Sequence, residues 1–202
     1  MNTEKALKQL NELKKYTNNL RLAAESWDRP WKILISTILS ARTRDEKTIA
    51  VCNVLFRKYK GAKDLAKANI NDVQKIINPV NYYKTKSKNI IQCAKTLVEK
   101  YNGNPPHDFN KLIELVGVGR KTANVFLSEI GRSTIAVDTH VAFLSQKLGW
   151  SKHDKPEKIE VDLKKLFPKA YWRKVNPTLV RFGRSYSKKN KEEILVKIKQ
   201  IK

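Results

Sequence analysis

Apolar residues recur every three or four positions along almost the whole chain, whereas runs of alternating apolar and polar residues are scarce. The first spacing is typical of one face of an α-helix, and alternation would be typical of a β-strand. The pattern therefore predicts an all-α protein. The expected helices are one around residues 7–13, one that contains WKILISTILSA, and the following ranges: 45–58, 62–68, 70–77, 85–101, 139–148, 155–166, 171–187 and 190–201.

Two of these helices have recognisable start signals. Asp28 and Pro30 suit the N-cap and the first turn of the helix that contains WKILISTILSA, which is apolar nearly all round, as expected for a helix buried in a bundle. Asn190 stands three residues before Glu193, which predicts a capping box at the start of the last helix. No apolar run approaches the roughly 18 to 20 residues that a membrane span needs.

The stretch FNKLIELVGVGRKTANVFLSEI predicts two helices joined by a tight turn. A short helix ends near Leu115, Gly117 and Gly119 interrupt the pattern, and a second helix begins at about Arg120. The turn amides and the positive end of the second helix suit one nucleic-acid phosphate, a contact that positions a strand without reading its sequence. Taken alone, two glycines at this spacing more often form an ordinary turn between helices than a phosphate site.

Lys121 lies in the first turn of that second helix, beside the loop. Helical spacing places it with Asn124 and Ser128 on a polar face. The positive end of the helix and the adjacent Arg120 disfavour a charged amine, and a neutral amine is a nucleophile. An ordinary solvated lysine is the simpler alternative in so basic a chain.

Asp138 follows the apolar run 135–137 and precedes a predicted helix, so it is well placed as the N-cap of that helix. A carboxylate fixed at a helix start can also stabilise positive charge on a sugar or transfer protons. Capping and catalysis are compatible, and the residue pattern does not choose between them.

The charge balance indicates a polyanionic partner. Lys and Arg outnumber Asp and Glu by 42 to 19, for a formal net charge of +23. The basic residues lie within periodic sequence rather than in a tail, which favours nucleic acid over a merely solubilising surface.

Cys52 and Cys93 lie in apolar helical patterns without metal-ligand spacing, which predicts reduced core thiols. Because the N-terminus has no secretory signal pattern, we expect an intracellular protein, and with a nucleic-acid partner a cytoplasmic or nucleoid-associated one.

The segment LVGVGRKTANVFL followed by TIAVDTH resembles the helix-hairpin-helix and the Gly/Pro-rich loop ending in Asp of the endonuclease III family of base-excision DNA glycosylases. Upstream, ILISTILSARTRDEKT resembles the family's LLSAQATD segment, and NYYKTKSKNII resembles its LYNSKAENI segment. Downstream, the resemblance reaches FGRSYS and so covers most of the chain. It implies two all-α lobes with DNA in a central cleft: a six-helix lobe at 22–133, with the hairpin at about 110–130, and a second lobe at 1–21 plus 134–202.

The resemblance also implies roles for individual residues. Lys121 would attack C1′ of a flipped, damaged nucleotide, and Asp138 would stabilise charge or activate the amine. A Schiff base and β-elimination would follow and cut the strand 3′ to the lesion. His140 matches a histidine of the endonuclease III branch, with a structural or a DNA-contacting role. The implied DNA-binding residues are Gly117, Val118, Gly119, Arg120, Arg42, Tyr82, Tyr83, Lys84 and His140.

Three positions depart from the family pattern. Ser187 replaces the first cysteine of the family's four-cysteine iron–sulfur cluster and no cysteine follows, so we expect no cluster and no other cofactor, although a monovalent cation at the hairpin turn is compatible with the sequence. Arg42 stands where the family has a space-filling glutamine, and Tyr82 stands near its leucine wedge. The last helix either covers the part of the core that the cluster loop would cover, with phosphate contacts from Lys188, Lys189, Lys191 and Lys197, or is a solvated tail.

We therefore expect a monomeric DNA glycosylase and abasic-site lyase that acts on duplex DNA with oxidised or otherwise damaged pyrimidines and on abasic sites. One alternative is a monofunctional mismatch or uracil-type glycosylase, in which water attacks. The other is a non-catalytic helix-hairpin-helix protein that uses the turn as a phosphate clamp.

Overall fold

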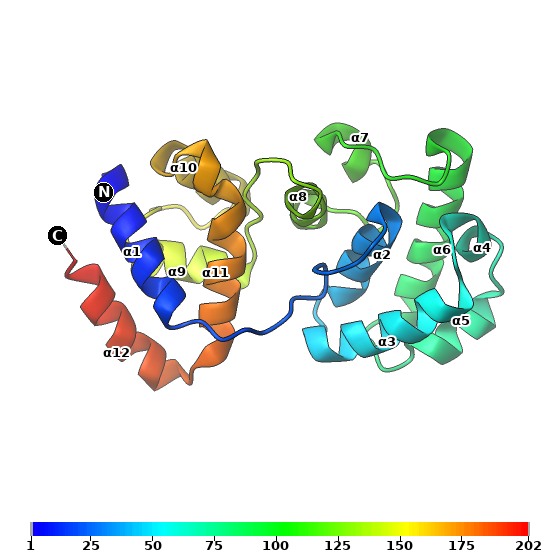
Figure 1. The fold of residues 1–202 in the computed structure, drawn as a ribbon, viewed down its shortest axis with the longest axis horizontal. Helices are drawn as coiled ribbons and strands as arrows, with labels where there is room; N and C mark the ends of the chain where they lie inside the picture. The colour runs from blue at the N-terminus through cyan, green and yellow to red at the C-terminus, as the bar shows by residue number, and fades with distance from the viewer. Residues whose placement is uncertain (1, 202) are drawn as a thin grey trace. The chain divides into compact units, whose positions relative to one another are not determined.

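The computed structural model describes residues 2–201, apart from the side chain of Lys188 (Figure 1). All regular structure in these residues is helical, which confirms the all-α prediction. The chain forms two compact units, one of Arg21–Ile130 and one that combines 1–20 with 131–202. These bounds differ by one to three residues from the lobe ranges expected from the sequence. No helix in the described part of the chain is both long and apolar enough to cross a membrane.

The Arg21–Ile130 unit contains seven α-helices in the residues described. Two of them have only five residues and are held by local caps. In the first, Asp64 accepts a hydrogen bond from the Gly61 amide at 3.1 Å, and in the second, Asp108 accepts one from the Lys111 amide at 2.9 Å. The helices are α2 (Pro30–Ser40), α3 (Asp45–Lys58), α4 (Ala62–Ala66), α5 (Ile70–Ile77), α6 (Tyr83–Tyr101), α7 (Phe109–Ile113) and α8 (Arg120–Glu129).

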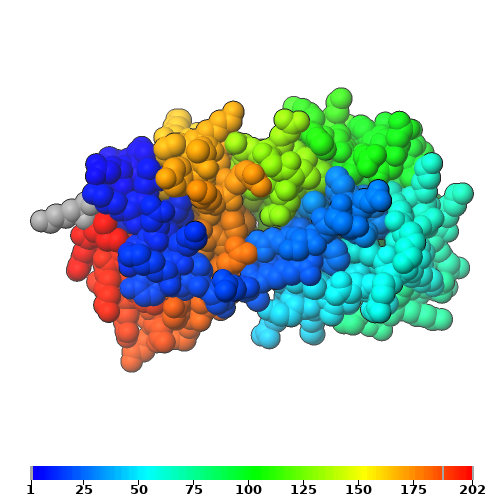
Figure 2. All heavy atoms as spheres, in the orientation of Figure 1, coloured from blue at the N-terminus to red at the C-terminus, as the bar shows by residue number. Residues whose placement is uncertain are grey.

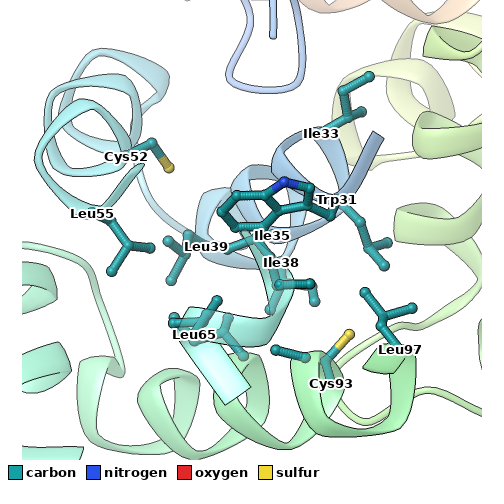
Figure 3. Close-up of a cluster of buried hydrophobic side chains, with 14 of the residues drawn as sticks. Trp31, Ile33, Ile35, Ile38, Leu39, Cys52, Leu55, Leu65, Cys93 and Leu97 are labelled. Atoms are coloured by element: carbon teal, nitrogen blue, oxygen red, sulfur yellow. The ribbon is translucent and has the colours of Figure 1, made fainter. Parts of the chain in front are cut away.

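The core of this unit is built around α2, which packs against α3, α6 and α8. Every residue from Ile33 to Leu39 is buried, as expected for a helix that is apolar nearly all round. Cys52 of α3 and Cys93 of α6 lie among leucine and isoleucine side chains of the same core (Figure 3). Both are free thiols, as predicted, and burial raises the pKa of each, to about 12 for Cys93. Neutral thiols in an apolar core are poor metal ligands.

The second unit is centred on α11, which packs against α1 and α9, while α12 packs against α1 (Figures 1 and 2). Leu195 and Ile198 of α12 join its apolar core. A buried amide links three segments, because Gln9 donates to the Ile198 carbonyl at 3.3 Å and accepts from the Trp150 indole at 2.7 Å. The elements are α1 (Thr3–Lys15), α9 (Thr139–Lys147), α10 (Pro156–Leu166), the 3₁₀ helix η1 (Lys169–Tyr171), α11 (Trp172–Ser185) and α12 (Lys188–Lys199).

Two predicted helix starts were wrong. The N-cap of α2 is Arg29, because the Asp28 carboxylate instead accepts a hydrogen bond from the Lys32 ammonium at 2.7 Å. The last helix begins directly after Ser187, whose hydroxyl accepts from the Asn190 amide at 3.3 Å. A hydroxyl in extended backbone three residues earlier takes the capping role that was assigned to Asn190.

Candidate functional site

The helix-hairpin-helix motif consists of α7, a short turn and α8. The turn is fixed from inside, since Val118 is buried and its amide donates to the Leu115 carbonyl at 3.0 Å. On the outer side, the Arg120 guanidinium lies 4.9 Å from the centre of the Phe109 ring. The ring of α7 and the guanidinium of α8 therefore contact each other across the motif, and Arg120 remains exposed.

The two glycines of this turn are needed for different reasons. Gly117 has φ +83°, and a Cβ atom there would stand 3.0 Å from Cβ and 3.2 Å from Nδ2 of Asn89, so both backbone conformation and space favour glycine. At Gly119, an added Cβ would meet nothing within 4 Å. This open space adjoins the start of α8. Because the N-cap residue Gly119 has no side chain, no N-cap side chain covers the first amides of the helix. A phosphate oxygen suits this position, because the helix dipole and the first amides favour an anion there.

Lys121 occupies the first turn of α8 and is half-buried. Thr122 and Ala123 beside it are buried, and α8 packs against α2 and α7. The expectation of a polar face shared with Asn124 and Ser128 needs correction, since Asn124 is only 3% exposed. Lys121 therefore lies at the edge of a packed surface, two residues after Gly119 in the chain.

Asp138 belongs to the other unit and is half-buried. Its Oδ1 accepts a hydrogen bond from the Val141 amide at 2.9 Å, so it caps α9 as predicted. The preceding residues 135–137 are buried, and the Asn176 side chain of α11 donates to the Ala136 carbonyl at 2.9 Å. Cap, core and α11 together hold the Asp138 carboxylate in one position.

His140 lies two residues further along and packs against α11. A Cβ atom at Gly183 would come within 2.4 Å of His140 Nδ1, so the imidazole occupies the room that the glycine leaves. The Gly183 carbonyl accepts a hydrogen bond from the Lys191 ammonium at 2.6 Å, which adds α12 to the same contact. Of the two roles considered for His140, this contact provides a structural one.

Arg42 and Tyr82 are forty positions apart in the sequence, and the structure brings them together. Both are exposed and have positive φ, 55° and 60°, which is uncommon for residues other than glycine. The Arg42 guanidinium lies 5.2 Å from the centre of the Tyr82 ring. Tyr83, by contrast, is half-buried against the core, whereas Lys84 is exposed. We call Arg42 and Tyr82 the exposed pair.

Lys86 is a buried polar residue that was not predicted from the sequence. It is only 6% exposed, and its ammonium donates hydrogen bonds to the Leu39 and Ala41 carbonyls at 2.7 and 2.5 Å and to the Thr43 hydroxyl at 3.3 Å. Burial lowers its pKa to about 8. A signal was present in the sequence, because Lys86 and Ile90 are four residues apart on the buried stripe of α6.

Comparison with known proteins gives consistent matches. A family model described as HhH-GPD superfamily base excision DNA repair protein matches residues 35–169. Endonuclease III of Thermotoga maritima is 43% identical over 160 residues, which cover 79% of this chain and 75% of the relative. Endonuclease III of Synechocystis sp. is 36% identical over 161 residues, with coverage of 79% and 74%. A solved structure of a trapped endonuclease III–DNA covalent intermediate matches with a TM-score of 0.84 and 32% identity, over 92% of this chain and 88% of that one.

Proposed function

The chain belongs to the endonuclease III family within the HhH-GPD superfamily of base-excision DNA repair proteins, and from this premise we propose how its residues act as a DNA glycosylase and abasic-site lyase. The observation that carries the proposal is the position of Lys121. It lies in the first turn of α8, two residues after Gly119, where the start of the helix is suited to a phosphate. A lysine there reaches the sugar of a strand whose backbone the hairpin holds.

The proposed reaction begins when the Lys121 amine forms a bond to C1′ of the damaged nucleotide. The bond between C1′ and the base breaks, and the base takes up a proton as it leaves. Opening of the sugar gives a protonated Schiff base. Removal of a proton from C2′ then breaks the bond from C3′ to its oxygen, which cuts the strand 3′ to the lesion. Asp138 stabilises the positive charge on the sugar or accepts the amine proton, a role supported by its fixed position at the start of α9.

Binding of duplex DNA rests on the hairpin and on the charge of the chain. Gly117, Gly119 and the start of α8 hold one phosphate, while the net charge of +23 adds contacts that do not depend on base sequence. The exposed pair fills the space of the extruded nucleotide, with a guanidinium for hydrogen bonds and a ring for stacking. A chromosomal substrate implies that the protein acts at the nucleoid, and we propose that it acts as a monomer.

Damaged pyrimidines in duplex DNA are the proposed base substrates, together with abasic sites. Damaged bases are poorly paired and therefore cost less to extrude than intact ones, which contributes to selection. Because the exposed pair differs from the glutamine and leucine typical of the family, substrate preference is the part of the proposal that most needs a direct test. A panel of thymine glycol, dihydrouracil, uracil, oxidised guanine and abasic duplexes would rank these substrates.

We propose that the protein works without an iron–sulfur cluster. A four-thiolate cluster does not fit this chain, because the sequence has two cysteines and both are buried in the core of the Arg21–Ile130 unit. In the part of the chain that the structure describes, no group of three or more His, Cys, Asp or Glu residues forms a potential metal site. The helix α12 takes the structural place of the cluster, supported by Leu195 and Ile198 in the core and by the Gln9 bond to the Ile198 carbonyl.

Reduction with borohydride tests the lyase mechanism. Wild-type protein incubated with an abasic or lesion-containing duplex and borohydride is expected to give a covalent protein–DNA adduct, and Lys121→Ala is expected to give none while still binding the duplex. Lys111→Ala, which removes an exposed charge from α7, is the matched control and should still form the adduct. Base release without an adduct would favour a monofunctional glycosylase, and binding without either would favour a non-catalytic DNA-binding protein.

A further inference from the structure

The buried Lys86 ammonium lies at a position that the reaction itself does not use. Its three N–H groups face three acceptors: the Leu39 carbonyl, the Ala41 carbonyl and the Thr43 hydroxyl. These acceptors lie on both sides of Arg42, between 43 and 47 positions from Lys86 in the sequence. An ammonium has three donors, so this side chain is fully used in holding one short loop.

The loop needs such a partner because it begins where α2 ends. The Leu39 carbonyl belongs to the last turn of α2, where the carbonyls receive no hydrogen bond from an amide of the same helix. A positive charge at a helix C-terminus is also favourable. Arg42 then adopts φ +55°, a strained conformation for a residue other than glycine, which persists only where the surroundings enforce it. Lys86 bonds to residues on both sides of that strained position.

The same network fixes Tyr82. The Thr43 hydroxyl accepts from Lys86 and also from the Asn81 amide, at 3.2 Å, and the Asn81 side chain donates to the Arg42 carbonyl. Tyr82 follows Asn81 directly, with φ +60°, and its carbonyl accepts from the Lys86 amide at 2.9 Å. Both members of the exposed pair are therefore held through one set of hydrogen bonds.

We propose that Lys86 is a positioning residue that locks Arg42 and Tyr82 into one rigid pair, and that this rigidity determines how well the protein extrudes a base from duplex DNA. The inference rests on the proposed function, from which the role of the exposed pair in extrusion is taken. A preorganised pair inserts without first being ordered, whereas a mobile pair must lose side-chain and loop freedom on binding. Burial makes a charged amine costly at this position, so an apolar residue would be the simpler choice if only packing mattered.

Hydrogen exchange tests, without any substrate, whether Lys86 holds the loop around Arg42 in one conformation. Lys86→Met keeps a long side chain and removes the three donors, while Lys88→Met on the exposed side of α6 is the matched control. Loss of these bonds leaves buried acceptors unsatisfied, which predicts that the Thr43 amide exchanges about tenfold faster or more in Lys86→Met. Lys88→Met should exchange like wild type.

Catalysis provides the second measurement. An abasic duplex has no base to extrude or release, so the ratio of adduct formation on a base-lesion duplex to that on an abasic duplex reports extrusion and release of the base. Lys86→Met is expected to lower this ratio about tenfold. This is the same factor as for hydrogen exchange, because the same lost hydrogen bonds raise the free-energy barrier. In an Arg42→Ala/Tyr82→Ala background, Lys86→Met should lower the ratio no further, because the pair that it positions is absent. A merely structural role would lower both rates together.

The outcomes separate the inference from the function on which it rests. If wild type forms no adduct on either duplex, the proposed function fails, and the exchange experiment still decides whether Lys86 locks the loop. If Lys86→Met shows wild-type exchange at Thr43 or a wild-type ratio, the inference is overturned. Should Lys86→Met not fold, Thr43→Val removes the hydroxyl that joins the Arg42 loop to Asn81 and Lys86. The same two measurements on that variant then decide whether the network positions the exposed pair.

Discussion

Gly183→Ala tests the packing that holds His140, and with it the start of α9, in place. A Cβ atom at this position would stand 2.4 Å from Nδ1, 2.9 Å from Cγ and 3.2 Å from Cβ of His140. Because the crowding includes Cγ and Cβ, rotation of the ring alone does not relieve it, and α9 and α11 must move apart. Such overpacking costs about 1 to 3 kcal/mol. Alanine would otherwise gain about 1 kcal/mol over glycine inside a helix, so the expected net loss is up to about 2 kcal/mol.

Urea unfolding of Gly183→Ala, His140→Ala and the double variant measures this effect. In the His140→Ala background the added Cβ meets no imidazole, so the same substitution is expected to stabilise the protein by up to about 1 kcal/mol. The change of sign between the two backgrounds is the signature of the contact. A stabilised single variant, or equal effects in both backgrounds, would refute the reasoning.

Three further predictions follow from the structure. Gly119→Ala should leave the unfolding free energy nearly unchanged but weaken DNA binding in a titration, whereas Gly117→Ala should lower both, because φ +83° and Asn89 oppose a Cβ atom there; equal stability losses would contradict this. Ile198→Ala should destabilise the protein by about 2 to 5 kcal/mol in urea if α12 is part of the core, and a loss under 1 kcal/mol would argue for a solvated tail. The folded-state pKa of Lys86, about 8, lies below the ordinary value of 10.5, so between these values the unfolded chain binds the proton and the folded chain does not. The unfolding free energy of wild type relative to Lys86→Met should therefore rise as pH rises from 8 to 10.5, and a flat or falling difference would contradict the assigned shift.

Local patterns were enough to predict most of the helices. The ranges 45–58 and 70–77 coincide with α3 and α5, because apolar spacing and the polar breaks on either side depend only on nearby residues. The Asp138 cap was predictable for the same reason. The caps at Asp28 and Asn190 were wrong because each had a competitor, the Lys32 ammonium in one case and the Ser187 hydroxyl in the other, and the sequence does not rank them.

The candidate site was predictable only where it is local. The position of Lys121 in the first turn of α8 followed from the glycines and the helical spacing next to it. The contact between Arg42 and Tyr82 spans forty positions and depends on how α2 and α6 pack, which spacing does not give. Lys86 was missed because two of its three acceptors are backbone carbonyls, and no residue type marks a carbonyl that lacks a partner. Its place on the buried stripe of α6 was the available signal.

The most direct test of the account is to identify the amine that becomes attached to DNA. Borohydride-reduced adduct formed on an abasic duplex is digested with protease and nuclease, and mass spectrometry locates the residue that carries the sugar remnant. The account predicts that the remnant lies on Lys121. Attachment at the N-terminal amine, at Lys86 or at any other lysine would contradict it.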